Sequence, residues 1–181
     1  MRVIDTAIAD VKLIEPTVHG DARGFFFESF NQRQFDAAIG HAVHFVQDNH
    51  SRSAHGVLRG LHYQLQQAQG KLVRVLQGAI FDVAVDLRRS SSSFGQWVGH
   101  ELSADNRLQL WLPAGFAHGF LVLGESAEVL YKTTDYYAPQ HEHCIRWDDP
   151  ALAIDWPLTA APILSARDAQ GTALTDAELF N

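Results

Sequence analysis

The stretch Gly56-Val57-Leu58-Arg59-Gly60-Leu61-His62-Tyr63-Gln64 is the centre from which the chain is best interpreted. It places polar and charged side chains on an apolar strand, which suits a ligand site better than a core. Regular alternation would put Arg59 and His62 on opposite faces. If both line one pocket, the alternation has to break between them, and Gly60 tolerates a bulge or a close backbone approach. The alternative is an exposed arginine beside a hydrogen-bonded core histidine.

The composition is that of a folded protein without an unusual charge balance. The chain has 181 residues, 46% of them hydrophobic, which predicts a single domain over 1–181 with a real core. Fourteen basic and 21 acidic residues give a formal charge of −7. This balance argues against a nucleic-acid partner, and a polyanionic ligand would need a local basic pocket.

The compartment is predicted from cysteine content and apolar runs. Cys144 is the only cysteine, so no internal disulfide can form, and a reducing cytosol fits. The N-terminus lacks a long apolar run, and no later segment has enough uninterrupted apolar residues to span a bilayer. We therefore expect a cytoplasmic protein with no membrane partner.

Short apolar segments punctuated by Gly, Pro and Asp predict an all-β sandwich or barrel with few short helices. The expected strands are 3–15 at an edge, 25–30, 44–49, a hairpin of 71–76 and 79–87, 96–102, 108–112, 120–122 and 128–134. The segment 113–119 is expected to be a turn. A helix is expected over 31–39, with Asn31 as N-cap and Gly40 as its end.

Two further patterns concern packing. In segment 79–87, Phe81, Val83, Val85 and Leu87 share one face, and Asp82 and Asp86 share the other. The tail from Trp147 to Phe180 is rich in loops but carries Trp156, Ile163 and Leu164, so we expect it to pack against the body.

Four basic residues stand near turns or strand ends of this acidic chain: Arg23, Arg59, Lys71 and Arg167. If they converge, they form a pocket for a diphosphate or carboxylate, because guanidinium groups pair with such oxygens in a bidentate manner. Taken singly, each is a solvated surface charge.

Acid–base chemistry has candidates as well. His62 is a potential general base if a carboxylate holds its ring, and Asp168 in Leu164-Ser165-Ala166-Arg167-Asp168 is a candidate among 21 acidic residues. Tyr131, Tyr136 and Tyr137 could donate a proton or stack on a base, although such tyrosines also serve in packing.

A metal site receives little support. The strand around His62 lacks the His-x-His pair that would place two imidazoles on one face, although His118 could contribute a ligand. His141-Glu142-His143-Cys144 contains such a pair, but in an expected loop where solvent-exposed histidines are the simpler interpretation. We expect no bound metal.

Seven motifs together resemble the dTDP-4-dehydrorhamnose 3,5-epimerase family, in order and over nearly the whole chain. They are Gly20-Asp21-Ala22-Arg23-Gly24-Phe25-Phe26-Phe27-Glu28, Gln47-Asp48-Asn49-His50-Ser51, the stretch 56–64, Lys71-Leu72-Val73-Arg74-Val75, Pro113-Ala114-Gly115-Phe116-Ala117-His118-Gly119-Phe120, Tyr131-Lys132 and Leu164-Ser165-Ala166-Arg167-Asp168. The resemblance implies a cupin-type jelly roll, a homodimer that exchanges strands, and no metal or cofactor. It also implies conversion of dTDP-4-dehydro-6-deoxy-D-glucose to dTDP-4-dehydro-L-rhamnose, a precursor of glycans such as lipopolysaccharide O-antigen.

The resemblance further implies a role for each matching residue. His62 matches the family's proton acceptor, Asp168 its dyad partner, Tyr131 its proton donor and Lys71 the residue near the 4-keto oxygen. Tyr137 matches the residue that stacks on thymine. The positions that match the other nucleotide-sugar contacts are Arg23, Glu28, Gln47, Asn49, Arg59, His118, Glu142 and Arg167.

Three alternatives stay open at this level. A mono-epimerase that inverts only C3 or C5 would share the base and the nucleotide pocket, and a tyrosine at position 131 favours double epimerisation without settling it. A metal-dependent cupin would need a bound metal ion. A sugar-binding jelly roll would keep the arginines and tyrosines but would not need His62 paired with Asp168.

Overall fold

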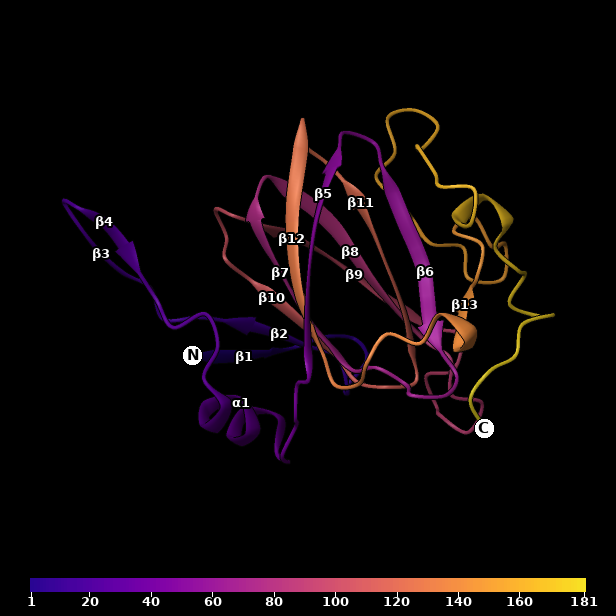
Figure 1. The fold of residues 1–181 in the computed structure, drawn as a ribbon, viewed down its shortest axis with the longest axis horizontal. Coiled ribbons are helices and arrows are strands. Elements are labelled where there is room, and N and C mark those ends of the chain that lie inside the picture. Colours follow the sequence, from indigo (N-terminus) through magenta and orange to yellow (C-terminus); the bar gives the residue numbers. More distant parts are fainter.

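Thirteen strands, one α-helix and two 3₁₀ helices make up the computed structural model, which describes residues 1–181 (Figure 1). The strands are β1 (Arg2–Asp5), β2 (Lys12–Glu15), β3 (His19–Asp21), β4 (Gly24–Phe26), β5 (Gln47–Ala54), β6 (Leu58–Gln64), β7 (Lys71–Gln77), β8 (Ala79–Asp86), β9 (Trp97–Ser103), β10 (Gln109–Leu112), β11 (Phe116–Val122), β12 (Ser126–Thr133) and β13 (Glu142–Cys144). The helices are α1 (Gln32–Ile39), η1 (Pro139–His141) and η2 (Asp168–Gln170).

Two antiparallel sheets face each other. One has the order β1-β2-β10-β7-β12-β5, the other has the order β13-β6-β11-β8-β9, and β3 and β4 form a separate hairpin. The predicted all-β sandwich with few short helices is therefore confirmed. No helix has the length and apolar content that crossing a membrane requires.

The core has two main layers because both faces of the five-stranded sheet are covered. Between the sheets, 16 buried residues such as Val73 and Phe120 form one cluster. On the outer face, Val83 and Val85 belong to a second cluster with Trp156 of the C-terminal segment. The tail thus packs against the body as predicted, although Ile163 is left exposed.

The hairpin predicted for 71–76 and 79–87 is wrong. β7 pairs with β10 and β12 in one sheet, whereas β8 pairs with β11 and β9 in the other. The chain changes sheet at Gly78, whose φ is +75° and whose added Cβ would lie 2.0 Å from the Ser126 carbonyl oxygen. Two consecutive apolar strands have the same sequence pattern whether they pair with each other or belong to different sheets. The alternation of apolar and polar residues therefore could not distinguish the two cases.

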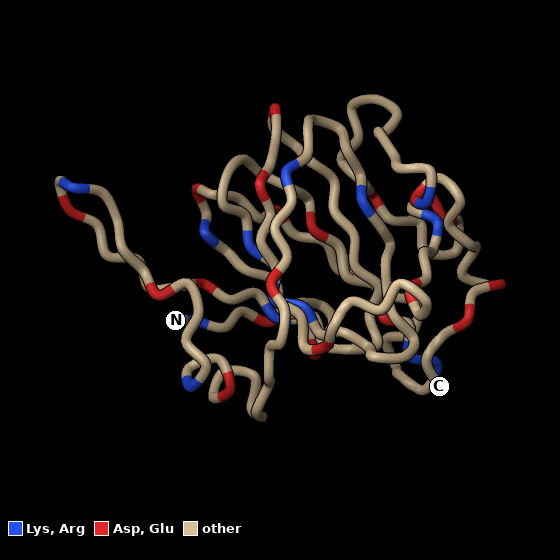
Figure 2. Tube along the Cα trace, viewed as in Figure 1, with Lys and Arg blue, Asp and Glu red and all other residues tan.

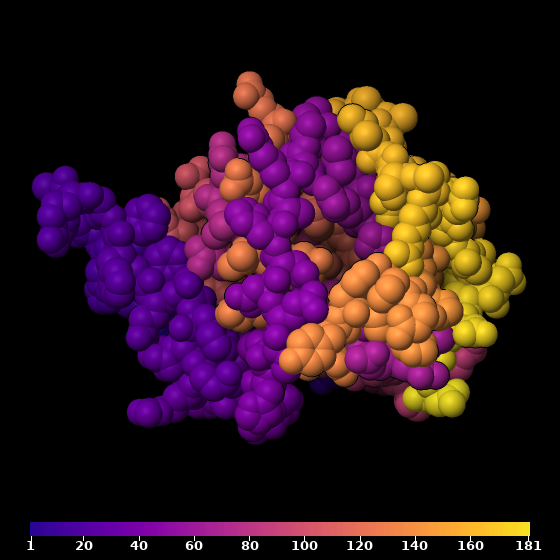
Figure 3. Space-filling model, in the orientation of Figure 1, coloured from indigo at the N-terminus to yellow at the C-terminus, as the bar shows by residue number.

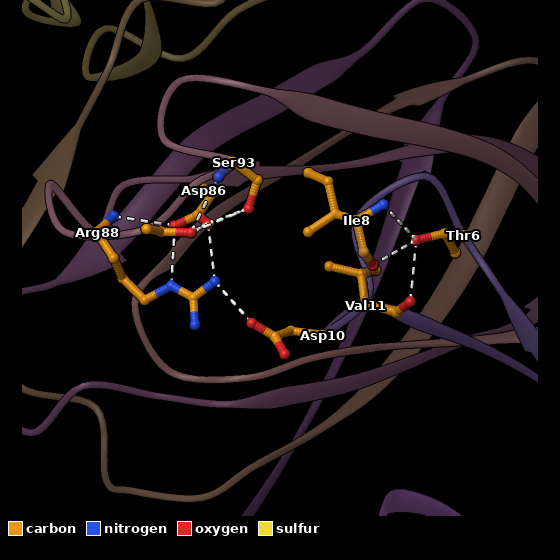
Figure 4. A network of polar contacts seen from close by, with 8 residues as sticks. Thr6, Ile8, Asp10, Val11, Asp86, Arg88 and Ser93 are labelled. Atoms are coloured by element: carbon orange, nitrogen blue, oxygen red, sulfur yellow. Dashed lines mark hydrogen bonds and ion pairs between the residues drawn. The ribbon is translucent and has the colours of Figure 1, made fainter.

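The strand predicted over 3–15 is two strands, β1 and β2, joined by a turn. The Thr6 hydroxyl bonds the carbonyls of Ile8 and Val11 at 2.9 Å and so closes this turn. Close to it, Arg88 donates to Asp10 at 2.8 Å and to the fully buried Asp86 at 2.7 Å (Figure 4). This ion-pair network ties the first turn of the chain to the loop that follows β8.

The strand predicted over 25–30 is also mostly wrong. Only Gly24–Phe26 is extended, as β4 of a hairpin that stands clear of the sandwich (Figures 1 and 3). Phe25 and Phe26 are 60% and 68% exposed, and the hairpin carries charges of both signs (Figure 2). Aromatic runs predict burial, yet these two rings stay mostly exposed, although the Arg107 guanidinium lies 4.5 Å from the centre of the Phe25 ring. We call residues 19–26 the arm.

The helix predicted over 31–39 is confirmed as α1. The Asn31 side chain accepts from the Gln34 amide, and Gly40 ends the helix with a φ of +88°. The helix packs Phe35 against Trp111 of β10, with ring centroids 5.3 Å apart in an edge-to-face arrangement.

Strand β6 changes face at Gly60, as the pocket hypothesis requires. Leu58 and Leu61 are three residues apart, yet both belong to the cluster on the outer face of the sheet. Arg59 and His62 are likewise three apart, and both line the cavity between the sheets. The β6–β11 register shifts at the same place. Arg59 is exposed, as the alternative interpretation expected, but His62 is only half-buried and lines the cavity, so it is not a core histidine.

The face change depends on a close backbone approach that excludes side chains. A Cβ on Gly60 would lie 2.5 Å from the Gly119 Cα and 2.7 Å from the His118 carbonyl oxygen, and the Gly60 φ is +122°. We expect Gly60→Ala to reduce the free energy of unfolding by about 2 kcal/mol or more, because strain and overpacking act together. Urea denaturation measures the loss.

Gly124→Ala is the matched control, since its nearest neighbour would be 3.9 Å away. It should leave stability within about 0.5 kcal/mol of wild type. Equal stabilities for the two variants would contradict the close-approach argument.

Candidate active site

A cavity of about 240 Å³ lies between the two sheets and gathers most of the residues singled out in the sequence. Of these residues, the cavity is lined by Gln47, Asn49, Arg59, His62, Lys71, His118, Tyr131, Tyr137 and Glu142. Strands of both sheets contribute, so the cavity has two chemically distinct walls.

The predicted His62–Asp168 pair is present. His62 Nε2 lies 2.6 Å from Asp168 Oδ1, although the two residues are 106 positions apart. Asp168 is only 3% exposed and comes from η2 in the C-terminal segment. With Nε2–H donating to the carboxylate, Nδ1 is the imidazole nitrogen left free to take a proton.

Asp168 is itself fixed by two further donors. The Gly60 amide donates to Oδ1 at 3.2 Å, and the Ser165 hydroxyl donates to Oδ2 at 2.6 Å. Burial alone would raise the pKa of Asp168, but the hydrogen bonds from His62, Ser165 and Gly60 outweigh burial and lower it to about 2. The carboxylate is therefore ionised at neutral pH and fixes the orientation of the imidazole.

Tyr131 faces the cavity from the other sheet. It belongs to β12 of the six-stranded sheet, whereas His62 belongs to β6 of the five-stranded sheet. Burial raises the pKa of the Tyr131 hydroxyl, and the charge of Glu142 raises it further. Tyr131 therefore carries its proton at neutral pH and presents it from the wall opposite His62.

Lys71 begins β7 and is buried, with only 6% of the residue exposed. Burial lowers the pKa of its amine to about 8, while the charges of Glu142 and Asp82 act in the opposite direction. The ammonium group is thus a charge held in a poorly hydrated cavity, where its interaction with a developing anion is strong.

Polar side chains connect to one another along one side of the cavity. Gln47 donates to Asn49 at 2.9 Å and accepts from the Tyr137 amide at 3.1 Å. The Tyr137 hydroxyl donates to Glu142 at 2.6 Å, and Arg167 also pairs with this carboxylate. Arg59 is fixed by a 3.0 Å bond to Ser53. This arrangement supplies donors, acceptors and an aromatic face to a ligand.

Several residues singled out in the sequence do not line this cavity. Arg167 lies beside it, paired with the lining residue Glu142. Arg23 lies on the arm and pairs with Asp21, and Glu28 lies just after the arm, where Asn31 and Gln34 donate to it. Tyr136 is exposed. Within one copy of the chain, the basic cluster is therefore only partly assembled.

Sequence reasoning missed two polar residues of the site. Ser165 lies in a motif that was quoted only for its neighbours, and Asp82 was seen only as one polar position in an alternating strand. The turn predicted over 113–119 is also wrong in its second half, because β11 begins at Phe116 and so contains His118. An aspartate on a strand whose neighbours are all apolar was the available signal for Asp82.

One group of side chains has the donor set of a metal site. The ligand atoms of His62, Cys144 and Asp168 all lie within 4.8 Å of one another. In this group burial and the charge of Asp168 raise the pKa of the Cys144 thiol to about 12, which opposes the thiolate that a metal needs. His143 instead stacks on Tyr63 at 5.4 Å, so the His-x-His pair does not assemble as a metal site.

The Asp168 carboxylate makes a pH-dependent contribution to stability. Its native pKa of about 2 lies below the value of about 3.9 for an unfolded aspartate, so the contribution is present above about pH 4 and is lost as the pH falls toward 2. We expect Asp168→Asn to be less stable than wild type at pH 7, with the difference narrowing below pH 4.

Urea denaturation at several pH values measures this difference. Asp155→Asn, at an exposed position of the tail, is the control and should match wild type. A difference between Asp168→Asn and wild type that stays constant down to pH 2 would contradict the assignment.

Comparisons with known proteins agree with this geometry. Residues 5–176 match the family model of dTDP-4-dehydrorhamnose 3,5-epimerase. The chain is 67% identical to the dTDP-4-dehydrorhamnose 3,5-epimerase of Pseudomonas aeruginosa over 180 residues, or 99% of each chain. It is 54% identical, with a TM-score of 0.96, to the crystal structure of a dTDP-6-deoxy-D-glucose-3,5-epimerase from Legionella pneumophila in complex with dTDP-4-keto-L-rhamnose, covering 98% of this chain and 94% of that one.

A functionally different relative has the same fold. A 3′-monoepimerase from Streptomyces bikiniensis, solved in complex with dTDP-quinovose, is 35% identical with a TM-score of 0.89, covering 94% of this chain and 87% of that one. The fold alone therefore does not fix how many carbons are inverted, whereas the higher identities lie with the double epimerases. The resemblance seen in the sequence is confirmed, and the chain belongs to the dTDP-4-dehydrorhamnose 3,5-epimerase family, which are isomerases of dTDP-L-rhamnose biosynthesis.

Proposed function

We propose that the chain converts dTDP-4-dehydro-6-deoxy-D-glucose to dTDP-4-dehydro-L-rhamnose by inverting C3 and C5 of the sugar in the cytoplasm. The observation that carries the proposal is the placement of a base and a proton donor on facing sheets. His62, paired with Asp168, lines one wall of the cavity, and Tyr131 lines the other. Inversion needs this arrangement, because the proton leaves from one face of the carbon and returns to the opposite face.

The substrate supplies the chemistry that makes proton removal feasible. C3 and C5 both flank the 4-ketone, so loss of either C–H proton gives an enolate stabilised by the carbonyl. His62 removes each proton as general base, and Tyr131 returns one from the opposite side. Asp168 orients the imidazole and stabilises the imidazolium that forms. Because the carbonyl takes up the electrons, the reaction needs no cofactor and no metal.

Lys71 stabilises the enolate oxygen. Its ammonium group reaches the cavity while the residue is buried, which is the setting in which a fixed charge acts most strongly on a developing oxyanion. Since the pKa of Lys71 is about 8, activity declines as the amine loses its proton above that pH.

The remaining residues in and beside the cavity bind the nucleotide. Arg59 pairs with the diphosphate through its guanidinium group, and Tyr137 stacks on thymine. The sugar and nucleotide are further held by Gln47, Asn49, His118, Glu142 and Arg167. This basic pocket accounts for ligand binding by a protein whose overall charge is −7.

A second copy of the chain completes the site. The arm leaves the sandwich, exposes Phe25 and Phe26, and carries Arg23 away from its own cavity. In a homodimer that exchanges this segment, Arg23 and Glu28 contact the nucleotide in the partner's cavity. The exposed aromatic rings then pack against the partner and are removed from water.

The first experiment is incubation with dTDP-4-dehydro-6-deoxy-D-glucose in D2O, with the label located by NMR. We expect deuterium at both C3 and C5, because His62 exchanges its proton with solvent. His62→Ala should abolish exchange at both carbons and leave nucleotide-sugar affinity within a few-fold of wild type. Label at one carbon only would make the chain a mono-epimerase. Exchange that persists in His62→Ala would contradict the assigned base.

Arm exchange is tested by mixing two inactive dimers, Arg23→Ala and His62→Ala, under conditions that allow subunits to exchange. In a hybrid dimer, the cavity with the intact His62 receives the intact Arg23 from the other subunit. Equal amounts should therefore recover about one quarter of the wild-type sites, as expected for a two-fold symmetric dimer. No recovery after subunit exchange has been verified would mean that Arg23 serves its own cavity or none.

A further inference from the structure

A second histidine–aspartate pair lies beside the first. In the pairing of β11 with β6, His118 is directly opposite His62. Its Nε2 lies 2.8 Å from Asp82 Oδ1, and His118 also lines the cavity. Two adjacent imidazoles are thus each held through Nε2 by a buried carboxylate.

The two carboxylates differ in how they are satisfied. Asp168 accepts three hydrogen bonds, which use both of its oxygens. Asp82 is fully buried and accepts a single bond from His118, while its Oδ2 has no partner. A buried carboxylate with a free oxygen is costly unless nearby positive charge compensates for it. This exception to the usual pairing of buried polar atoms calls for an explanation.

Lys71 supplies such a charge. Lys71 and Asp82 interact electrostatically, and both are buried, so their interaction is weakly screened. Asp82 is paired in register with His100 on β9, and the negative charge of Asp82 acts to raise the pKa of His100 against the effect of burial. Asp82 is thus a buried negative charge that acts on Lys71, the residue assigned to the enolate oxygen.

We propose that Asp82 is a positioning residue for the reaction, which holds the His118 ring at the cavity and balances the ammonium charge of Lys71. The proposal rests on the role of Lys71 given above. Asp82 does not touch the substrate, because His118 stands between it and the cavity. It acts on the enolate only through the two residues that it holds.

The pH dependence of the reaction shows this role. Burial lowers the pKa of Lys71 to about 8, and Glu142 and Asp82 are the negative charges that keep it from falling further. The other charged or titratable groups lining the cavity are Arg59, His62, Tyr63, His118, Tyr131 and Tyr137. None of these groups is negatively charged near neutral pH, so none replaces Asp82 when its charge is removed.

The test compares kcat/KM from pH 6 to 10 for the full-length wild type and Asp82→Asn. Asparagine can still accept from His118, so the variant removes mainly the charge. We expect the alkaline limb, near pH 8 in wild type, to move down by about one pH unit. At pH 7.5, kcat should fall about threefold, and above pH 9 about tenfold, with little change in KM. A limb that stays in place in folded Asp82→Asn would overturn the proposal.

Two further variants make the result specific. Asp82→Glu keeps the negative charge, so its alkaline limb should stay near pH 8 even if kcat falls. This variant also tests the proposal if Asp82→Asn folds poorly. An alkaline limb lowered as far in Asp82→Glu as in Asp82→Asn would overturn the proposal. Asp149→Asn alters a buried carboxylate that accepts from the amides of Ala151, Leu152 and Leu174. It should reduce stability without moving the limb, and a limb that it moves as far as Asp82→Asn would also overturn the proposal.

The experiments distinguish a wrong role for Lys71 from a wrong role for Asp82. If the alkaline limb of wild type persists in Lys71→Met, the assigned role of Lys71 is wrong and the charge-balancing role of Asp82 falls with it. If Lys71→Met removes the limb and Asp82→Asn does not move it, Lys71 keeps its role and only the inference about Asp82 is overturned.

Discussion

The close approach of β6 and β11 at Gly60 and Gly119 is the constraint on which the site depends. Neither position has room for a side chain, since a Cβ on Gly119 would lie 2.8 Å from the Arg59 carbonyl oxygen. Because the backbones meet there, β6 changes face, so that Arg59 and His62 both reach the cavity while Leu58 and Leu61 both stay in the outer core. The same glycine donates its amide to Asp168. A single irregular position thus links core packing, cavity lining and the hydrogen bonding of Asp168.

Burial gives each charged group of the cavity its chemical role. Asp168 is held ionised by three hydrogen bonds, whereas Lys71 has a pKa near 8 because its surroundings hydrate it poorly. Lys71 belongs to the six-stranded sheet, whereas Asp168 approaches His62 of the five-stranded sheet from η2. An acidic protein can in this way present positive charge to an anionic sugar nucleotide without having a basic surface.

Much of this was predictable from sequence, for reasons that are local. The need for a face change at Gly60, the helix with Asn31 and Gly40 at its ends, and the burial of Trp156 each follow from a few neighbouring residues. The pairing of Asp168 with His62 and the place of Tyr131 in the cavity were expected from the family motifs, because spacing alone could not choose one carboxylate among 21. The assignment of β7 and β8 to different sheets could not be predicted, since it depends on pairing partners far along the chain. The exposure of Phe25 and Phe26 was missed for a related reason. A run of aromatic residues indicates that the rings are buried, but not whether the same chain or another molecule buries them.

The C-terminal segment gives the enzyme an uneven distribution of local stability. Asp168 reaches His62 from a tail whose backbone is attached by isolated bridges, which are Val57 with Ile163, Ile145 with Thr172 and Arg88 with Phe180. The Tyr63 hydroxyl on the Glu178 carbonyl and apolar packing against the outer core add to these bridges. The two sheets, by contrast, are held by continuous ladders of hydrogen bonds. Segments with few such bonds open at lower free energy than the sheets they cover. Opening of the tail would separate Asp168 from His62 while the sandwich stays intact, so amide hydrogen exchange in the tail measures how often this pair is broken.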